Sequence, residues 1–354
     1  MIALTITALT LRDRRLAPVD DGPGVRYSAS APVGGDILSI RLLPVTKLHV
    51  ACAAEGEYVV HSAAMLHSVL ACHPPDSVVI HYLHGPELPK RTRSQLQEMV
   101  AEGGGEVRFW EIPDSWCDGL PTEGFTRKAT WYRVFLPELL PDVARVLYLD
   151  ADVIVLDSVA PLWEMDLTAT LVAAVTNVLD PQSVDRPTPL EMTGSHGYFN
   201  AGVMVLNLDL MRREESSRAL CDFGRAHADE LAWRDQDALN VVLGSSRVPL
   251  HPRWNCMNGL RVFPWSAEVL GAKAVAEALE NPAIRHFEGP GPYKPWHYLC
   301  EREWRDLYRR HRRATPWPHV RVEGRNPRSV WRRVRGRVSG ASVGFIDAPS
   351  LADR

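Results

Sequence analysis

Residues 145–157 read Arg-Val-Leu-Tyr-Leu-Asp-Ala-Asp-Val-Ile-Val-Leu-Asp, and no other stretch says as much about the chain. A run of strand-forming residues ends in Asp150-Ala151-Asp152, and a second apolar run follows directly. Two carboxylates at the carboxyl end of a strand lie where open α/β sheets bind ligands. Oxygen ligands suit a hard cation such as Mg²⁺ or Mn²⁺, which can hold a diphosphate. Taken alone, these residues are equally typical of an ordinary strand followed by an acidic turn.

Strand-like and helix-like segments alternate from residue 47 onward. The expected strands cover residues 47–54, 78–83, 106–112, 145–150, 171–176, 202–208, 247–250 and 283–287, the last of which closes the sheet. The expected helices cover residues 58–72, 90–101, 130–140, 210–227 and 235–243. This alternation predicts an α/β fold with a mostly parallel sheet built from right-handed crossovers.

The composition is that of a globular enzyme. The chain has 354 residues, of which 45% are hydrophobic and 23% charged. It has no apolar run long enough for a transmembrane helix and no signal-peptide pattern. The six cysteines lack a metal-binding spacing and indicate reduced core thiols in a cytoplasmic protein. Residues 1–44 are expected to be a poorly ordered leader and residues 45–317 the folded domain.

The C-terminal end is strongly basic. Residues 302–337 contain thirteen arginines and three acids, although the net charge of the whole chain is only −3. Residues 318–354 are therefore expected to form a basic tail. A helix in this tail would have an apolar face made of Val330, Trp331, Val334 and Val338. Such a helix can lie on the inner, anionic face of a membrane. A solvated, disordered tail is the alternative, and no nucleic-acid recognition motif is present.

The turn after the first expected strand, Ala53-Ala-Glu55-Gly-Glu57-Tyr58, has the composition of a nucleobase pocket. Backbone and carboxylate groups can contact the edge of a base, and the ring of Tyr58 offers a stacking surface. The turn is not a glycine-rich phosphate loop, because the G-x-G-x-x-G pattern is absent. An acidic helix start is the alternative interpretation.

Two later segments place polar side chains at expected strand and helix ends. Asn200 precedes a small-residue turn into a buried strand, where its amide could bind sugar hydroxyls or simply be a turn residue. Asp235 lies where a helix N-cap is expected. Gln236, next to it, is expected to project freely toward a ligand.

The segment from His286 to Trp296 combines an imidazole, glycines and a lysine. An imidazole at the end of a strand can be a third protein ligand to a divalent metal. Gly289 and Gly291 allow the backbone to approach a phosphate, and Lys294 supplies a compact positive charge. The Gly-x-Gly-x-x-Lys pattern favours this interpretation over a lone core or surface histidine.

The order of these motifs over roughly residues 47–300 resembles glycosyltransferase family 8, which includes bacterial lipopolysaccharide galactosyl- and glucosyltransferases and glycogenin. The resemblance implies a GT-A fold, a Rossmann-like α/β fold with a mostly parallel mixed sheet flanked by helices. It also implies a UDP-sugar donor carrying glucose or galactose, an Mn²⁺ (or Mg²⁺) cofactor, and retention of configuration at the transferred sugar.

The resemblance also implies roles for individual residues. The metal ligands would be Asp150, Asp152 and His286. The donor contacts would be Ala53, Glu55 and Tyr58 for uridine, Gly289 and Lys294 for the diphosphate, Asn200, Asp235 and Gln236 for the sugar, with Arg133, Ala151 and Asn177 as further contacts. Two departures from the family pattern are a longer loop between Gly289 and Lys294 and the acid Glu57 in the base-reading turn.

The expected chemistry is transfer of the sugar to an acceptor hydroxyl, with Asp235, Gln236 and Lys294 as the catalytic residues. The bound cation and Lys294 would stabilise the departing diphosphate. Attack from the face that the diphosphate leaves needs no protein nucleophile, and we favour this route. A double displacement would need one. Asp235 is the only nearby carboxylate for it, because Gln236 is a poor nucleophile.

Two other functions fit parts of the pattern. A catalytically inactive nucleotide-sugar-binding protein would keep the pocket, but the complete set of expected metal ligands argues against it. A sugar-phosphate nucleotidyltransferase would ordinarily need a basic glycine-rich loop where residues 53–57 are acidic.

A carbohydrate, lipid-linked or small-molecule acceptor is expected at residues 179–196 and 258–265, with residues 181–197 forming a mobile lid.

Overall fold

The computed structural model describes residues 47–122, 128–192, 197–319 and 321–339. The leader predicted at residues 1–44 therefore lies outside the described residues, as do residues 193–196 of the expected lid. The described residues all belong to one compact unit.

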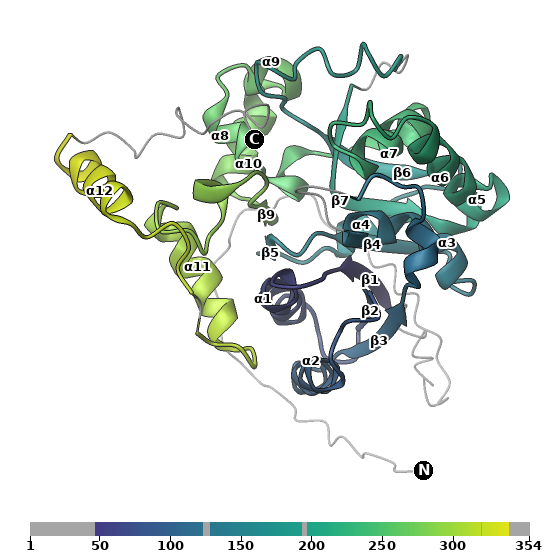
Figure 1. The fold of residues 1–354 in the computed structure, drawn as a ribbon, viewed down its shortest axis with the longest axis horizontal. Helices are drawn as coiled ribbons and strands as arrows, with labels where there is room; N and C mark the ends of the chain where they lie inside the picture. The colour runs from purple at the N-terminus through teal and green to yellow at the C-terminus, as the bar shows by residue number, and fades with distance from the viewer. Residues whose placement is uncertain (1–46, 123–127, 193–196, 320, 340–354) are drawn as a thin grey trace, which may run out of the picture. The chain divides into compact units, whose positions relative to one another are not determined.

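A seven-stranded mixed sheet runs through this unit (Figure 1). Its strands lie in the order β3-β2-β1-β4-β7-β6-β8. β7 is antiparallel to both of its neighbours and the other pairs are parallel, which confirms the predicted mostly parallel sheet. The strands are β1 (Leu48–Ala53), β2 (Val78–His84), β3 (Glu106–Glu111), β4 (Arg145–Leu149), β6 (Val172–Thr176), β7 (Phe199–Asn207) and β8 (Arg247–Pro249).

The direction in which the sheet grows reverses between β1 and β4. The chain adds β2 and β3 outward from one side of β1, whereas β4 pairs with its other side. Open α/β sheets bind ligands beyond the carboxyl ends of the strands at such a switch point. The turn that follows Ala53 and the acidic turn that follows Leu149 meet at this edge.

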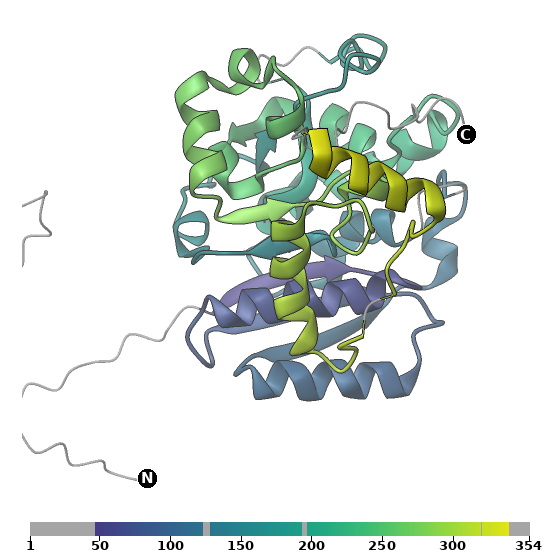
Figure 2. The same ribbon diagram turned by 90° about the vertical axis from the view of Figure 1, so that its left-hand side faces the viewer.

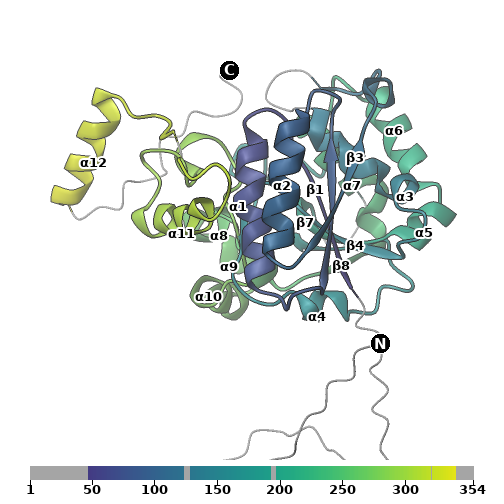
Figure 3. The ribbon, with the colours of Figure 1, turned by 90° about the horizontal axis from the view of Figure 1, so that it is seen from below.

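Helices cover both faces of the sheet. On one face, α1 (Tyr58–Ala71) and α2 (Lys90–Glu102) lie side by side (Figure 3) and join one core cluster. The other face packs against the 3-10 helix η2 (Lys128–Phe135), α3 (Leu136–Leu139), α5 (Leu208–Arg213), α6 (Ser216–Ala226) and α7 (Asp235–Leu243). Because side chains alternate along a strand, β4 gives Leu147 and Leu149 to the first core and Val146 and Tyr148 to the second.

A separate two-stranded sheet pairs β5 (Val153–Val155) with β9 (Ile284–His286) in antiparallel orientation. The prediction that residues 283–287 close the main sheet is therefore wrong. The position beside β4 is already taken by β7, so β9 pairs with the strand that follows the acidic turn. Val153 lies opposite His286, which brings the imidazole next to Asp152.

Two predicted helices also differ from the structure. The helix expected at residues 130–140 is η2 followed by α3, because Pro137 has no N–H to continue the helical hydrogen bonding. The helix expected at residues 210–227 is α5 followed by α6. Glu215 between them has a φ of 51°, which an α-helix does not accommodate.

The remaining described elements are short helices and the two C-terminal helices, which Figure 2 shows from the side. They are η1 (Asp114–Cys117), α4 (Ala160–Trp163), η3 (Gly244–Ser246), η4 (Pro252–Asn255), α8 (Gly259–Val262), α9 (Ser266–Leu270), α10 (Ala272–Glu280), η5 (Gly291–Tyr293), α11 (Arg302–Arg313) and α12 (Pro327–Ser339). Within the described ranges, no helix has both the length and the apolar character that a membrane span requires. The six cysteines are free thiols, as predicted.

Three buried histidines should make the fold acid-sensitive. Burial, the largest cause, lowers the pKa of His61 and His81 from 6.5 to about 3 and that of His311 to about 4. The unfolded chain therefore binds protons more readily, and stability falls as the pH drops below 6.5 toward these values. We expect these groups to lower the free energy of unfolding by at most about 4 kcal/mol between pH 7.5 and 5.5.

Denaturant unfolding at the two pH values measures this effect. His81→Gln should remove about a third of the decrease, whereas the same change at the exposed His319 should leave it intact. Equal stabilities of the wild-type protein at both pH values would contradict the prediction.

Candidate active site

The two acids that follow β4 are held by backbone hydrogen bonds to different elements. The N–H of Asp150 donates to the carbonyl of Gly202 in β7 at 2.8 Å, which continues the main sheet. The carbonyl of Asp152 accepts from the N–H of Phe287 at 3.0 Å, which starts the small sheet. The acidic turn is thus fixed between β7 and β9.

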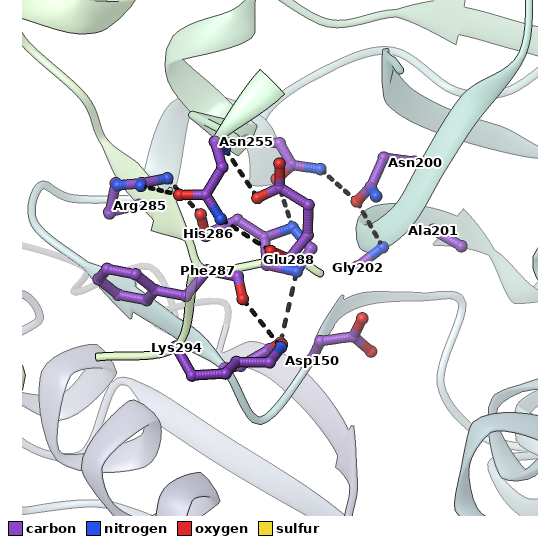
Figure 4. A network of polar contacts seen from close by, with 12 residues as sticks. Asp150, Asn200, Ala201, Gly202, Asn255, Arg285, His286, Phe287, Glu288 and Lys294 are labelled. Carbon is purple, nitrogen blue, oxygen red and sulfur yellow. Dashed lines mark hydrogen bonds and ion pairs between the residues drawn. The ribbon is translucent and has the colours of Figure 1, made fainter. Parts of the chain in front are cut away.

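Asp150, Asp152 and His286 converge at this edge. Figure 4 shows Asp150 and His286 of this group. One ligand atom from each residue lies within 4.8 Å of the others. The Nε2 atom of His286 is 3.3 Å from Asp152 Oδ1. Two carboxylates and one imidazole form a donor set that suits a divalent cation such as Mn²⁺. The structure therefore brings together the three residues for which the sequence predicted a metal site.

A network of amides orients His286 (Figure 4). Its Nδ1 lies 2.9 Å from Asn255 Oδ1, and Asn255 Nδ2 donates to Asn200 Oδ1 at 2.8 Å. The N–H of Gly202 donates to the same Asn200 oxygen at 3.0 Å. Because an amide oxygen only accepts, His286 Nδ1 carries a proton and Nε2 faces the acids. Asn255 has no counterpart among the predicted site residues.

Gly202 makes room for this arrangement. A Cβ atom at this position would lie 2.8 Å from Asp150 Oδ2 and would overlap the ring of His286. The backbone of β7 can approach the acids and the imidazole only because residue 202 has no side chain. This contact gives a physical reason for a glycine in the small-residue stretch that follows Asn200.

Lys294 neutralises Asp152. Its Nζ forms an ion pair with Asp152 and donates to the carbonyl of Phe287 at 2.8 Å. Burial alone would raise the pKa of Asp152, but Lys294 and His286 outweigh it and hold that pKa well below its usual range. Burial would lower the pKa of Lys294 and of His286, and the charge of Asp152 outweighs it and raises both.

Arg133 joins Asp150 to Asp235. Its Nη1 lies 3.3 Å from Asp150 Oδ1, its Nε lies 3.0 Å from Asp235 Oδ2, and its guanidinium stacks over Tyr148 at 4.5 Å. Burial raises the pKa of Asp235 to about 6, with Arg133 opposing the rise and Asp150 adding to it. The buried guanidinium of Arg133 thus forms ion pairs with two carboxylates.

Asp235 and Gln236 differ from their predicted settings. Asp235 is the first residue of α7 and not its N-cap, which is Arg234 in a strained conformation (φ 50°). Gln236 does not project freely. Its Oε1 accepts from the N–H of Ala201 at 3.0 Å, and its Nε2 donates to the hydroxyl of Tyr198 at 3.3 Å. The sequence could not show this contact, because it depends on the position of β7 beside Gln236.

Asp237 supports this arrangement and was not among the predicted site residues. It is fully buried and accepts from the hydroxyl of Tyr198 at 2.7 Å and from the N–H of Trp233 at 2.8 Å. Arg186, from the expected lid, pairs with it at 2.5 Å. The only sequence signal was its place as the second acid of the Asp-Gln-Asp motif.

A pocket of about 210 Å³ opens beside the acids. Its lining combines the turn after β1, the start of η2 and the acidic turn, and comprises Ala53, Ala54, Glu55, Tyr58, Ala129, Thr130, Arg133, Tyr148, Asp150, Ala151 and Asp152. The predicted uridine contacts and the predicted metal-binding acids therefore border one cavity. Its place at the switch point between β1 and β4 is the expected place for a ligand.

The other predicted donor contacts lie outside the pocket's lining as far as the described residues form it. The N–H of Asn177 donates to the carbonyl of Tyr198 at 2.8 Å. Gly289 has a φ of 83°, a conformation that favours glycine, and turns the chain toward Lys294.

The profile of glycosyl transferase family 8 matches residues 49–300. This range contains the acidic turn, the Asp-Gln-Asp segment and His286 in the order described above. The chain belongs to glycosyl transferase family 8.

Individual relatives agree with this assignment. General stress protein A of Bacillus subtilis is 30% identical over 275 residues, which cover 76% of this chain and 94% of that protein. The lipopolysaccharide 1,3-galactosyltransferase of Salmonella typhimurium is 21% identical over 281 residues (77% and 80% coverage). The crystal structure of galactosyltransferase LgtC with donor and acceptor sugar analogues matches with a TM-score of 0.65 at 26% identity, covering 74% and 95%. The fold is GT-A, as the sequence resemblance implied.

A side chain at position 202 should disrupt the metal site without unfolding the protein. In Gly202→Ala, Asp150 and His286 must move away from the new methyl group. We expect Mn²⁺ affinity, measured by calorimetry, to fall at least about 10-fold. In the control Gly244→Ala, the nearest side-chain atom is Met192 Cε, at 3.6 Å from the new Cβ. Equal Mn²⁺ affinity of Gly202→Ala and wild type would show that the three residues do not form the site.

Proposed function

We propose that this member of the family is a metal-dependent, retaining hexosyltransferase that moves glucose or galactose from a UDP-sugar to an acceptor hydroxyl. The observation that carries the proposal is the convergence of Asp150, Asp152 and His286 within 4.8 Å beside a pocket lined by Glu55 and Tyr58. Lipopolysaccharide galactosyl- and glucosyltransferases among the relatives support a hexose donor.

The residues fit a divalent cation. Asp150, Asp152 and the Nε2 atom of His286 would hold it, and Gly202 leaves the space that a methyl group would fill. Mn²⁺ or Mg²⁺, when bound, supplies positive charge beside the leaving diphosphate. The network through Asn255 and Asn200 keeps the imidazole lone pair directed toward the acids.

The chain's own cations support the same step. Lys294 lies against Asp152 and can offer its ammonium to the diphosphate once the donor occupies the site. Arg133 fixes Asp150 and Asp235 relative to each other. Uridine would bind in the pocket at Ala53 and Glu55, with its ring against Tyr58.

Asp235 does not have the setting of a nucleophile. It is buried and its carboxylate is held by an ion pair with Arg133. Burial outweighs that pairing and raises its pKa to about 6, so the charged form that a nucleophile needs is disfavoured. Gln236 is neutral and bonded at both ends of its amide. This arrangement favours attack by the acceptor hydroxyl from the face that the diphosphate leaves, over a covalent double displacement.

Removal of either acid should abolish activity. We expect Asp150→Ala and Asp152→Ala to lower Mn²⁺-dependent release of UDP from UDP-glucose or UDP-galactose at least about 100-fold. Asp157→Ala is the matched control, because Asp157 is an exposed aspartate whose ion pair with Arg253 lies away from the acids. Near wild-type activity of either Asp150→Ala or Asp152→Ala would refute the mechanism.

UDP binding, UDP release and pyrophosphate release, measured together, separate the alternatives. A nucleotide-sugar-binding protein without activity would bind UDP with Mn²⁺ but release none from any donor. A nucleotidyltransferase would release pyrophosphate from a nucleoside triphosphate. The acidic turn at Glu55 and Glu57 disfavours that reaction, because a triphosphate site needs basic and glycine-rich backbone there.

We also propose that α12 contacts an anionic membrane and so brings the transferase to a lipid-linked acceptor. The predicted helix is present over Pro327–Ser339, and it exposes Val330 (37%), Trp331 (62%) and Val334 (55%) beside its arginines. A solvated helix would gain nothing from exposed apolar side chains, whereas a bilayer interface buries them.

Vesicle sedimentation tests this contact. We expect Trp331→Ser combined with Val334→Ser to weaken binding to phosphatidylglycerol-containing vesicles about 10-fold. Val269→Ser, at an equally exposed valine on α9, is the control. Equal sedimentation of the double variant and the wild type would refute the proposal.

A further inference from the structure

Residues that follow the region matched by the family lie beside the loop of the candidate active site. The match ends at residue 300, and α11 and α12 follow it. Between them, residues 321–326, here called the strap, run beside Trp296, His297 and Tyr298. These three residues directly follow the loop that carries Lys294.

Backbone hydrogen bonds join the strap to this segment. The N–H of Glu323 donates to the carbonyl of Trp296 at 3.1 Å, and the N–H of Tyr298 donates to the carbonyl of Glu323 at 2.8 Å. His297 and Glu323 thus form an isolated parallel β-bridge. The strap therefore fixes the backbone two residues beyond Lys294.

Gly324 allows this close approach. It has a φ of 66°, and a Cβ atom at this position would overlap the ring of His297. The ring is itself fixed, because its Nδ1 accepts from the N–H of Leu299 at 3.1 Å. Any other residue at 324 would push the strap away from the loop.

Trp296 connects the strap to the candidate active site. It is buried (4% exposed), its ring stacks on His61 at 3.5 Å, and its edge meets Tyr58 at 5.8 Å. Tyr58 lines the pocket, and the Nζ of Lys294 lies 5.8 Å from the Trp296 ring. A shift of Trp296 would therefore move both the aromatic wall and the lysine.

The carboxylate of Glu323 adds a second contact to Trp296. It lies within interaction range of the indole N–H, the only polar group of that side chain. Burial, followed by the charge of Glu57 across the site, raises the pKa of Glu323. Glu323 thus lies within electrostatic range of the turn that follows β1.

The first turn of α12 anchors the strap from the other side. The hydroxyl of Ser329 donates to the carbonyl of Gly324 at 2.6 Å, and the N–H of Ser329 donates to Asn326 Oδ1 at 3.0 Å. Arg333 donates to the carbonyl of Tyr298 and lies 4.8 Å above its ring. The strap is held at both ends.

We infer that Glu323 and Gly324 are positioning residues for the nucleotide donor, acting through Trp296 on Lys294 and Tyr58. The inference rests on the proposed function, because it assumes that UDP occupies this pocket. The strap, which lies outside the family match, would then contribute to donor affinity. The chemical steps remain with the residues that contact the donor.

Calorimetry with UDP and MnCl₂ on full-length variants tests the inference. Glu323→Pro removes the N–H and the carboxylate, and Gly324→Ala forces the strap away from His297. Each should weaken UDP binding about 10-fold and raise the donor KM by a similar factor, and kcat should fall as well because Lys294 also faces the departing diphosphate. Glu323→Gln keeps both backbone bonds and an acceptor for the indole, and should bind UDP within about 2-fold of wild type.

Two further variants separate positioning from general destabilisation. Arg325→Ala changes an exposed strap residue and should leave UDP affinity unchanged. His297→Ala removes the ring that Gly324 contacts, so Gly324→Ala in that background should regain affinity. Wild-type affinity in Glu323→Pro and Gly324→Ala would overturn the inference, as would failure of His297→Ala to restore affinity to Gly324→Ala. Failure of the wild-type protein to bind UDP with MnCl₂ would instead overturn the proposed function.

Discussion

The low exposure of the Asp152 side chain (10%) is the constraint on which the rest of the site depends. A carboxylate with so little access to water must be paired, and its two partners are His286, at the end of β9, and Lys294, in the loop that follows β9. The antiparallel register of β5 and β9 brings that segment into place, since Val153 faces His286. Without the charge of Asp152, the loop that carries Lys294 would lose its ion pair with the acidic turn. The imidazole of His286 would lose its charged partner at this edge.

The side-chain charges of the site nearly balance without a metal. The three carboxylates of Asp150, Asp152 and Asp235 meet two permanent cations, Arg133 and Lys294, and the imidazole of His286, which is neutral when its Nε2 atom binds a metal. A divalent cation alone would add uncompensated positive charge, and a diphosphate alone would add uncompensated negative charge. Both together leave the balance unchanged, so the electrostatics favour joint binding of cation and donor over the binding of either alone.

The sequence predicted the site residues that lie at the ends of strands. It did not predict the features that depend on pairing between distant segments, namely the β5–β9 sheet and the contact of Asn255 with His286. The acids after β4 and the turn after β1 follow from local patterns, because the carboxyl ends of parallel strands share an edge. β5 and β9 have three residues each, too few for a periodic signal, and their pairing is set by the already occupied place beside β4. Asn255 lies 31 residues from His286, and nothing in its neighbours indicates that it holds the imidazole. The break at Glu215 was equally hidden, since a positive φ at a glutamate has no sequence signature.

The strap lies at the surface, and this has a consequence for donor affinity. Its residues Glu323, Gly324 and Asn326 are exposed and held mainly by hydrogen bonds, whereas the strands that carry the acids are buried on both faces. Segments with few apolar contacts open at lower free energy than the core does. If only the closed strap positions Trp296 and Lys294, the apparent donor dissociation constant is the intrinsic value divided by the closed fraction. Any partner that stabilises α12 against Tyr298 would then raise donor affinity without touching the pocket, because it increases that fraction.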